Sequence, residues 1–275
     1  MSTARDMMVR AAPWVRVAAV CSLGLALQAC GARRVAIPGD AGAPFPDFAE
    51  LHTQIAAACT ATRTFTAELS LSGRAGAERV RGRVIAGFER PDSMRLEGVA
   101  PFGPPAFILA ARGPEAVLFL PRDRRVLSGS PADQILGALT GVTLGPADVQ
   151  AVLTGCVTPA PQAKAGRRHA NGWVSLDLTS GAVLFLEMRD GSWQLRAARR
   201  AGWQIEYGGW QGRYPSTVRL MSGGEGPPVD LTAVLSQVEV NVDIVPAAFT
   251  VDLPSGVESL SIEELRAAGP LRGSP

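Results

Sequence analysis

Apolar and polar residues alternate through much of the chain, and this pattern predicts β-strands. Apolar residues recur with a period of two from 65 to 71 and again, between arginines, from 80 to 88. This period places one row of side chains in a core and the other in water, as in an antiparallel sheet. The segments 106–111 and 115–120 are apolar on both faces, so we expect cover on both of their sides. Further strands are predicted at 172–178, 182–188, 192–199, 202–208, 214–222 and 229–245.

Three segments instead carry apolar residues at the helical spacings of three and four. One runs from Asp47 to Cys59, with Glu50 as the predicted capping partner of Asp47. Two short helices are predicted over 130–139 and from Pro146 to a stop at Gly155. The pattern therefore predicts a mainly β fold (α+β), an antiparallel and unclosed β-barrel of about 10–11 strands covered by a helical lid.

The first 29 residues have the organisation of a bacterial signal peptide. Three arginines precede the apolar run 17–27, which is too short for an ordinary transmembrane helix. The run ends in Leu27-Gln28-Ala29-Cys30, which resembles the lipobox of bacterial lipoproteins. That resemblance implies cleavage before Cys30 and acylation of this cysteine, which makes membrane attachment stable because more than one acyl chain is added. The alternative is an ordinary signal peptide that leaves Cys30 as a free thiol.

These signals divide the chain into four parts. We expect a cleaved signal peptide over 1–29, the acylated cysteine and a tether over 30–46, the main β domain over 47–253 and a C-terminal tail over 254–275. The tether contains Gly, Ala and Pro without periodicity. A loop is predicted over 156–171, and the polar tail carries one short helix from Ser261 to Ala268.

Charge and cysteine content narrow the classes of partner. The chain has 27 basic and 25 acidic residues, and loss of residues 1–29 removes three arginines and Asp6, which leaves a net charge of zero. We therefore expect no broad attraction to nucleic acid or anionic lipid. Cys21 leaves with the signal peptide, so Cys59 and Cys156 remain beside Cys30. They either form a disulfide, which would contribute about 4–5 kcal/mol on the chain-entropy model, or stay two buried thiols.

Catalytic and metal-binding motifs are missing from the sequence. Lys164 is followed by Ala165, so no phosphate-binding loop is present, and His52 and His169 lack the spacing of zinc ligands. His169 lies in a basic loop, where we expect it to be solvated. Three carboxylates alternate with apolar residues, as on the wet face of a sheet: Asp177, Glu187 and Glu206. We expect a protein that is not an enzyme and that uses no cofactor or metal.

Three segments together resemble the LolB family, the outer-membrane receptors for bacterial lipoproteins, whose fold relative is the periplasmic carrier LolA. They are the turn Pro101-Phe102-Gly103, the helical pair with Ile135–Val142 and Val152–Gly155, and the strand Trp203–Trp210 followed by Tyr214-Pro215. The turn is similar to the family's Pro-Leu-Gly, and the strand is similar to its W-x-aliphatic-x-Y-G-G. The resemblance covers about residues 47 to 253. It departs from the family at Phe102, in the added stretch 172–190 and in the tail.

The resemblance implies a half-barrel with a hydrophobic cavity under a helical lid. Its ligand would be the acyl chain of a lipoprotein handed over by a LolA-like carrier, and burial of about 0.8 kcal/mol per CH₂ would drive binding. Gly31, next to the acylated cysteine, favours the periplasmic face of the outer membrane, and we expect a monomer. The candidate lining residues, each of which fits plain core packing equally well, are Phe65, Leu69, Phe88, Leu96, Leu109, Phe119, Leu195, Ile205 and Tyr207.

Phe102 is a candidate of a different kind. The prolines at 101, 104 and 105 remove backbone donors and stiffen the turn. An exposed apolar residue at this turn is taken in the family to help release cargo into the membrane, so Phe102 is the predicted membrane wedge, or else it lies under the barrel rim. Two other functions stay open. One is a LolA/LolB-like protein for another lipid, and the other is a structural envelope lipoprotein whose interior is filled by its own side chains.

Overall fold

The computed structural model describes residues 35–156, 162–200, 202–222 and 228–268. The predicted signal peptide, the acylation site Cys30 and the start of the tether lie outside the described residues, as does the end of the predicted tail. The chain divides into two units, Met1–Ala36 and Ile37–Pro275. The second unit contains every strand and helix described below. No helix in the described ranges is long and apolar enough to cross a membrane.

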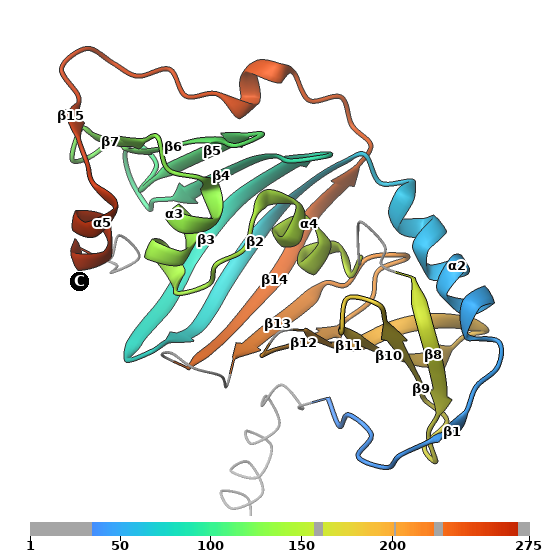
Figure 1. Ribbon diagram of the computed structural model, residues 1–275. Helices are drawn as coiled ribbons and strands as arrows, with labels where there is room; N and C mark the ends of the chain where they lie inside the picture. The colour runs from blue at the N-terminus through green and yellow to red at the C-terminus, as the bar shows by residue number, and fades with distance from the viewer. Residues whose placement is uncertain (1–34, 157–161, 201, 223–227, 269–275) are drawn as a thin grey trace, which may run out of the picture. The chain divides into compact units, whose positions relative to one another are not determined.

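Strands make up most of the second unit (Figure 1). The first eight are β1 (Ala43–Pro44), β2 (Thr64–Ala75), β3 (Glu78–Glu89), β4 (Ser93–Val99), β5 (Ile108–Arg112), β6 (Glu115–Leu120), β7 (Arg125–Ser128) and β8 (Ala163–Arg168). The remaining seven are β9 (Val174–Leu178), β10 (Val183–Arg189), β11 (Ser192–Arg200), β12 (Trp203–Gly208), β13 (Thr217–Ser222), β14 (Val229–Val240) and β15 (Glu258–Ser259).

All of these strands belong to one sheet. Its order from edge to edge is β1-β8-β9-β10-β11-β12-β13-β14-β2-β3-β4-β5-β6-β7-β15. Neighbouring strands pair antiparallel, except that β15 pairs parallel to β7. The short strands β1 and β15 form the two edges and do not pair with each other, so the sheet is unclosed. The predicted fold class, a mainly β protein built on an open antiparallel sheet with helices, is confirmed.

The sheet of the described residues has 15 strands, more than the sequence predicts. The predicted loop over 156–171 is wrong, because it contains β8, and the predicted tether contributes β1 to the edge of the sheet. β8 lacks apolar alternation because Gly166 occupies its inward position. A Cβ on Gly166 would lie 2.5 Å from the Cβ of Phe48 and 3.0 Å from the carbonyl oxygen of Phe45. Close backbone packing, which hydrophobic periodicity does not report, therefore fixes this strand.

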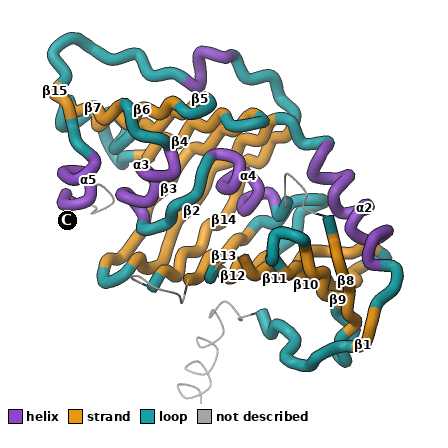
Figure 2. Tube along the Cα trace, in the orientation of Figure 1, coloured by secondary structure: helices purple, strands orange, loops and turns teal. Residues whose placement is uncertain are grey.

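The helices are α2 (Phe48–Thr60), α3 (Ala132–Thr140), α4 (Pro146–Thr154) and α5 (Ile262–Ala268), with the 3₁₀ turn η2 (Pro246–Phe249). Helices α3 and α4 lie over the same side of the sheet (Figure 2). They end at Gly141 and Gly155, both in the left-handed conformation, and the predicted stop at Gly155 is confirmed. Asp47 precedes α2 but makes no side-chain capping bond, so the predicted capping pair with Glu50 is wrong.

The core lies between the sheet and these helices. We call the face whose side chains join this core the inner face, and the opposite one the outer face. Phe65, Phe88 and Leu109 of the inner face are fully buried, as is Ile135 of α3. Part of the outer face is covered as well. Arg95 Nη1 of β4 donates to the carbonyl oxygens of Ala248 and Thr250, each at 2.9 Å, and the segment between them contains the buried Phe249.

The predicted C-terminal tail folds onto the rest of the unit. The predicted short helix is present as α5, and it packs against α3. Ser261 and Glu264 form a capping box, in which Glu264 N–H donates to Ser261 Oγ and Ser261 N–H donates to Glu264 Oε2. Leu265 is fully buried and Leu260 nearly so. Residues 258–268 are therefore part of the core structure and not a separate tail.

Candidate functional site

Eight of the nine predicted lining residues share the inner face. Each of the eight is buried and belongs to one apolar cluster with the helices: Phe65, Leu69, Phe88, Leu96, Leu109, Leu195, Ile205 and Tyr207. Burial raises the pKa of the Tyr207 hydroxyl by desolvation, so this group stays neutral. The sequence thus gathers distant strands onto one apolar surface, as the alternation predicts.

Phe119 does not belong to this surface, and its assignment was wrong. It lies on β6 between Leu118 and Leu120, which both join the inner cluster, so its own side chain is on the outer face. There the register places it between Ile108 of β5 and Val126 of β7. Because β6 is apolar on both faces, sequence alternation could not assign its inner side.

The inner face is packed against its helices. A hollow of about 30 Å³ lies between α2, the end of α4 and strands β10 and β11, and it is lined by His52, Ile55, Ala56, Cys59, Gly155, Leu184 and Leu195. This volume holds one or two water molecules and is far too small for an acyl chain. At this place the space between the sheet and the helices is therefore filled by side chains.

A larger hollow of about 510 Å³ lies elsewhere, at the ends of β11, β12 and β13. Arg199, Arg200, Trp203 and Met221 are among its lining residues. It is open to solvent, and its lining residues belong to strands and turns, with Arg200 donating to Asp148 of α4 at 2.8 Å. It is therefore not the cavity that the family resemblance implies.

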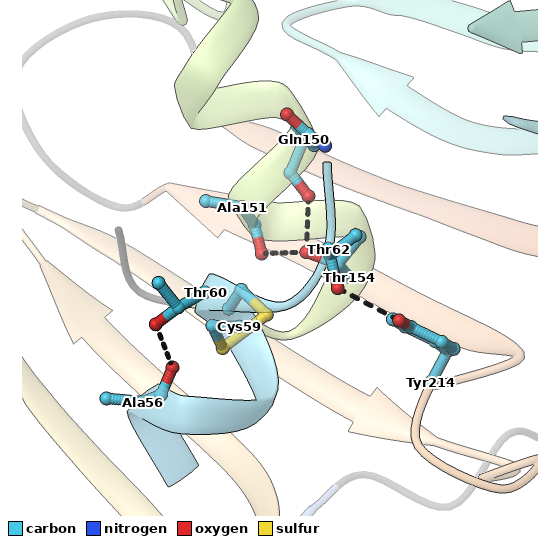
Figure 3. The surroundings of a disulfide bond; sticks show 9 residues. Ala56, Cys59, Thr60, Thr62, Gln150, Ala151, Thr154 and Tyr214 are labelled. Atoms are coloured by element: carbon cyan, nitrogen blue, oxygen red, sulfur yellow. Dashed lines mark hydrogen bonds between the residues drawn. A yellow bond between two sulfur atoms is a disulfide. The ribbon is translucent and has the colours of Figure 1, made fainter. Parts of the chain in front are cut away.

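A disulfide joins Cys59, at the end of α2, to Cys156, directly after α4 (Figure 3). The two Cα atoms are 5.3 Å apart. Nearby, Thr154 Oγ1 donates to the carbonyl oxygen of Gln150 at 2.7 Å. The hydroxyl groups of Thr62 and Tyr214 are 2.9 Å apart, within hydrogen-bond distance. The disulfide therefore ties together the two helix ends that border the small hollow.

The loop 100–105 between β4 and β5 presents Phe102 to solvent. The Phe102 side chain is 88% exposed, so it does not lie under a rim. Its carbonyl oxygen accepts a hydrogen bond from Arg122 Nη2 at 2.9 Å, and Arg122 lies in the turn between β6 and β7. The loop is thus tied to a neighbouring turn through its backbone, while its apolar side chain points away from the core.

The base of this loop is closed by tight packing. Ala106 N–H donates to the carbonyl oxygen of Gly98 at 2.8 Å, and Gly98 N–H donates to that of Phe107 at 3.0 Å. The Phe107 ring is buried directly over Gly98, where an added Cβ would lie 2.6 Å from two ring carbons. The two phenylalanines therefore have opposite roles, because Phe107 anchors the loop in the core and Phe102 is held outside it.

A polar cluster that the sequence did not reveal lies at the other end of the sheet. His169, expected to be solvated, is buried: its Nε2 lies 2.9 Å from Ser175 Oγ and its Nδ1 lies 3.3 Å from Asp40 Oδ1. Desolvation alone would raise the pKa of the Asp40 carboxyl. Hydrogen bonds from the backbone N–H groups of Ala170 and of Asp40 itself, together with His169, outweigh it and lower this pKa. Ser175 is only 3% exposed. The cluster is thus a clamp that holds the residues before β1 onto β8.

Glu206, expected on a wet face, is also buried. Its Oε1 accepts a hydrogen bond from Gln204 Nε2 at 3.0 Å, and its Oε2 lies 3.9 Å from Arg219 Nη1. Arg219 in turn makes two hydrogen bonds to Asp230, which raise its pKa. The outer face of β12 to β14 therefore carries a network of linked ion pairs. The alternation of apolar and polar residues cannot tell a buried, paired carboxylate such as Glu206 from a solvated one.

Comparison with known proteins gives a likeness of fold. No protein-family model matches the chain, and no curated protein sequence matches it. A LolA superfamily protein from Nitrosomonas europaea is 11% identical at a TM-score of 0.45, covering 76% of this chain and 98% of that one. A DUF1329 family protein from Desulfovibrio piger is 10% identical at a TM-score of 0.49, and the match covers 76% of this chain and 98% of that one.

A third solved structure is a putative outer membrane lipoprotein-sorting protein domain from Vibrio parahaemolyticus. It is 9% identical at a TM-score of 0.45 and covers 73% of this chain and 94% of its own. All three TM-scores lie below 0.5, so we assign neither a family nor a ligand from them.

Proposed function

We propose that the protein is a lipid-anchored envelope receptor that accepts acylated lipoproteins from a periplasmic carrier and passes them to the membrane to which Cys30 attaches it. One observation carries the proposal, the exposure of Phe102 on a loop held in place by Arg122. A buried phenylalanine side chain gains about 1.5–3 kcal/mol over an exposed one. A bilayer supplies that burial when the loop tip enters its interface, and the tip is therefore suited to direct contact with lipid.

The anchor restricts how far the protein can move from the bilayer. Cys30 is ten residues before Asp40, where the chain is held by His169. A segment of this length extends at most about 36 Å. A tether that short keeps the folded unit near the membrane surface and restricts where a cargo can be released.

Acyl binding on the inner face requires the helical layer to move. The residues that would contact an acyl chain now contact α3 and α4 or one another. An entering chain would exchange these apolar contacts for its own, at a gain of about 0.8 kcal/mol for each CH₂ removed from water. The disulfide at Cys59 and Cys156 holds one end of this layer, so the opening would take place at the α3 end.

The packed interior supports a second candidate, a structural envelope lipoprotein without a ligand. Its supporting observation is the small volume of the hollow under α2 and α4. In this case Phe102 would only hold the protein against its membrane. The two candidates differ in one measurable property, the binding of an acyl chain by the folded protein in water.

The test is a displacement assay with the chain from residue 30 onward, which carries Cys30→Ala to prevent acylation and is exported behind an ordinary cleavable signal peptide. An apolar fluorescent probe is bound first and is then competed with a triacylated lipopeptide or with the same peptide lacking acyl chains. The receptor function predicts displacement by the acylated peptide only. Equal behaviour of the two peptides, or no binding of the probe, would leave the structural candidate. In cells, depletion of a true receptor strands lipoproteins before they reach the outer membrane.

A further inference from the structure

The outer face of β3 carries a row of exposed side chains. Arg79, Arg81, Arg83 and Ile85 occupy alternate positions of the strand, and all four are exposed, Ile85 at 53%. The residues between them include the buried Val80 and Val84, which point inward. Alternate residues of a strand lie about 6.5 Å apart on one face. Three guanidinium groups are therefore spaced along one surface, next to an apolar side chain.

The neighbours of this row leave it strongly basic. In the register of the hairpin, Arg79 lies directly opposite Arg74 of β2, and Arg81 lies opposite Ser72. Like charges opposite each other destabilise a strand pair. The acidic groups that face the row are Glu68, which pairs with Arg83 at 3.2 Å, Glu97 of β4, which lies opposite Ile85 and pairs with Arg95, and Asp230, which lies opposite Arg74 and accepts two hydrogen bonds from Arg219. A net charge of zero for the mature chain thus conceals a local concentration of positive charge.

This row lies beside the loop that carries Phe102. Val99, the last residue of β4, pairs with Arg83, so the loop leaves β4 next to the half of β3 that bears Arg79 and Arg81. Figure 1 shows β2 and β3 continuing beyond the end of β4. Phe102 is three residues from Val99, which limits its distance from that strand end to about 11 Å. Arg122, which holds the loop, adds a further cation there.

We propose that Arg79, Arg81 and Arg83 form, with Phe102, a membrane-docking edge that binds the phosphate groups of anionic lipid headgroups. Guanidinium groups bind phosphate oxygens through paired, charge-assisted hydrogen bonds. An anionic bilayer surface can bind both parts of this edge. The Phe102 ring would lie among the acyl chains, and the arginines of the row would lie at the headgroups. The inference deepens the proposed function and rests on it, because it names the lipid on which the Phe102 loop acts.

The test measures partitioning of the same unacylated chain (residue 30 onward, Cys30→Ala) onto vesicles. One set of vesicles is phosphatidylcholine, and the other has part of it replaced by phosphatidylglycerol. The row variant carries Arg79→Gln, Arg81→Gln and Arg83→Gln. A matched control carries Arg63→Gln, Arg112→Gln and Arg213→Gln, which removes the same charge from exposed positions at the other end of the strands. Thermal unfolding of each variant establishes that it is folded.

The row variant is expected to bind anionic vesicles roughly 10- to 100-fold more weakly, since each arginine near an anionic surface contributes to attraction. Its binding to neutral vesicles should not change, and high salt should remove the difference between wild type and variant. Equal loss in the control triple, or equal binding of wild type to both vesicles, would overturn the inference. So would a wild type that binds an acidic protein but no vesicle.

The lipopeptide displacement assay separates this inference from the proposed function. If the row variant loses vesicle binding but still exchanges its probe for acylated peptide, both stand. If acylated peptide is never bound while the row still governs vesicle binding, the receptor function fails and the docking edge remains. If acylated peptide is bound normally and the row has no effect on vesicles, the docking edge alone is wrong.

Discussion

Arg122 holds the backbone of Phe102, not its side chain: its Nη2 donates to the Phe102 carbonyl oxygen at 2.9 Å while the ring stays in solvent. The guanidinium thus fixes the direction of an apolar group without covering it. An exposed loop would ordinarily lower its free energy by folding such a ring onto the protein surface. The combination of three prolines, this hydrogen bond and the buried Phe107 prevents that here.

Replacement of Phe102 should separate membrane contact from stability. Phe102→Ala is expected to weaken vesicle binding of the unacylated chain by about 1.5–3 kcal/mol, because it removes the group that enters the bilayer. The free energy of unfolding should change by less than about 0.5 kcal/mol, as for an exposed site. Arg122→Ala, which frees the loop but keeps the ring, should give a smaller loss.

Val245→Ala is the matched control for Phe102→Ala, since Val245 is another exposed apolar side chain on a different segment. Vesicle flotation and urea unfolding measure the two properties. A loss of binding in Val245→Ala as large as that in Phe102→Ala would contradict a specific role of the loop.

The disulfide gives a second prediction. Cys59→Ser with Cys156→Ser should lower the free energy of unfolding by about 2–5 kcal/mol, because the bridge closes a long loop of the unfolded chain. If the opening takes place at the α3 end, the same variant should bind the apolar probe as the wild type does, and tighter binding would show that the α4 end opens as well. Urea unfolding and probe titration measure the two effects. An unchanged unfolding midpoint would show that the bridge does not constrain the chain.

Much of the sheet could be predicted from the sequence, and the reason is physical. Strands β2, β3 and β14 alternate because one face is buried, so their side chains report the fold directly. β8 could not be predicted, because its inward position is Gly166 and its contacts are made by backbone. The period of apolar residues also cannot show which face of a strand is inward when both faces are apolar. For this reason Phe119 was predicted on the inner face of β6 and lies on the outer one.

The buried polar groups were missed for a different reason. His169 is buried by Asp40, which is 129 residues away in the sequence, and Glu206 by neighbours on two strands. The local sequence does not reveal these partners, because His169 follows two arginines in a predicted loop and Glu206 alternates with apolar residues as a solvated carboxylate does. Phe102, in contrast, was placed correctly at the tip of its turn, because three prolines within five residues determine the loop locally.

The packing of Phe107 on Gly98 gives a third prediction. Gly98→Ala forces the new methyl group into the Phe107 ring and should cost about 1–3 kcal/mol of stability. In a Phe107→Ala background the same substitution should cost much less, since the ring is gone. A double-mutant cycle from urea unfolding measures this coupling. Additive costs in the cycle would show that the ring does not limit position 98.

The last prediction concerns acid and the clamp at Asp40. The pKa of Asp40 is lowered in the folded chain, so folding favours its ionised form. The stabilisation is complete above the ordinary pKa of 3.8 and is lost as the pH falls through the lower folded value. Protonation of Asp40 weakens it as the acceptor of Ala170 N–H and changes its hydrogen bond with His169 Nδ1. The chain before β1 should then separate from β8 below about pH 4.

Hydrogen exchange at the amide of Ala170, which donates to Asp40 Oδ2 at 3.3 Å, measures this release. In the wild type, the protection factor, corrected for the intrinsic exchange rate at each pH, should fall as the pH drops below about 4, because the pKa of Asp40 is lowered in the folded chain. Asp40→Asn keeps a hydrogen-bond acceptor but does not titrate, so its protection should be lower at neutral pH and independent of pH in this window. A fall in protection of the same size in Asp40→Asn would assign the acid sensitivity to another group.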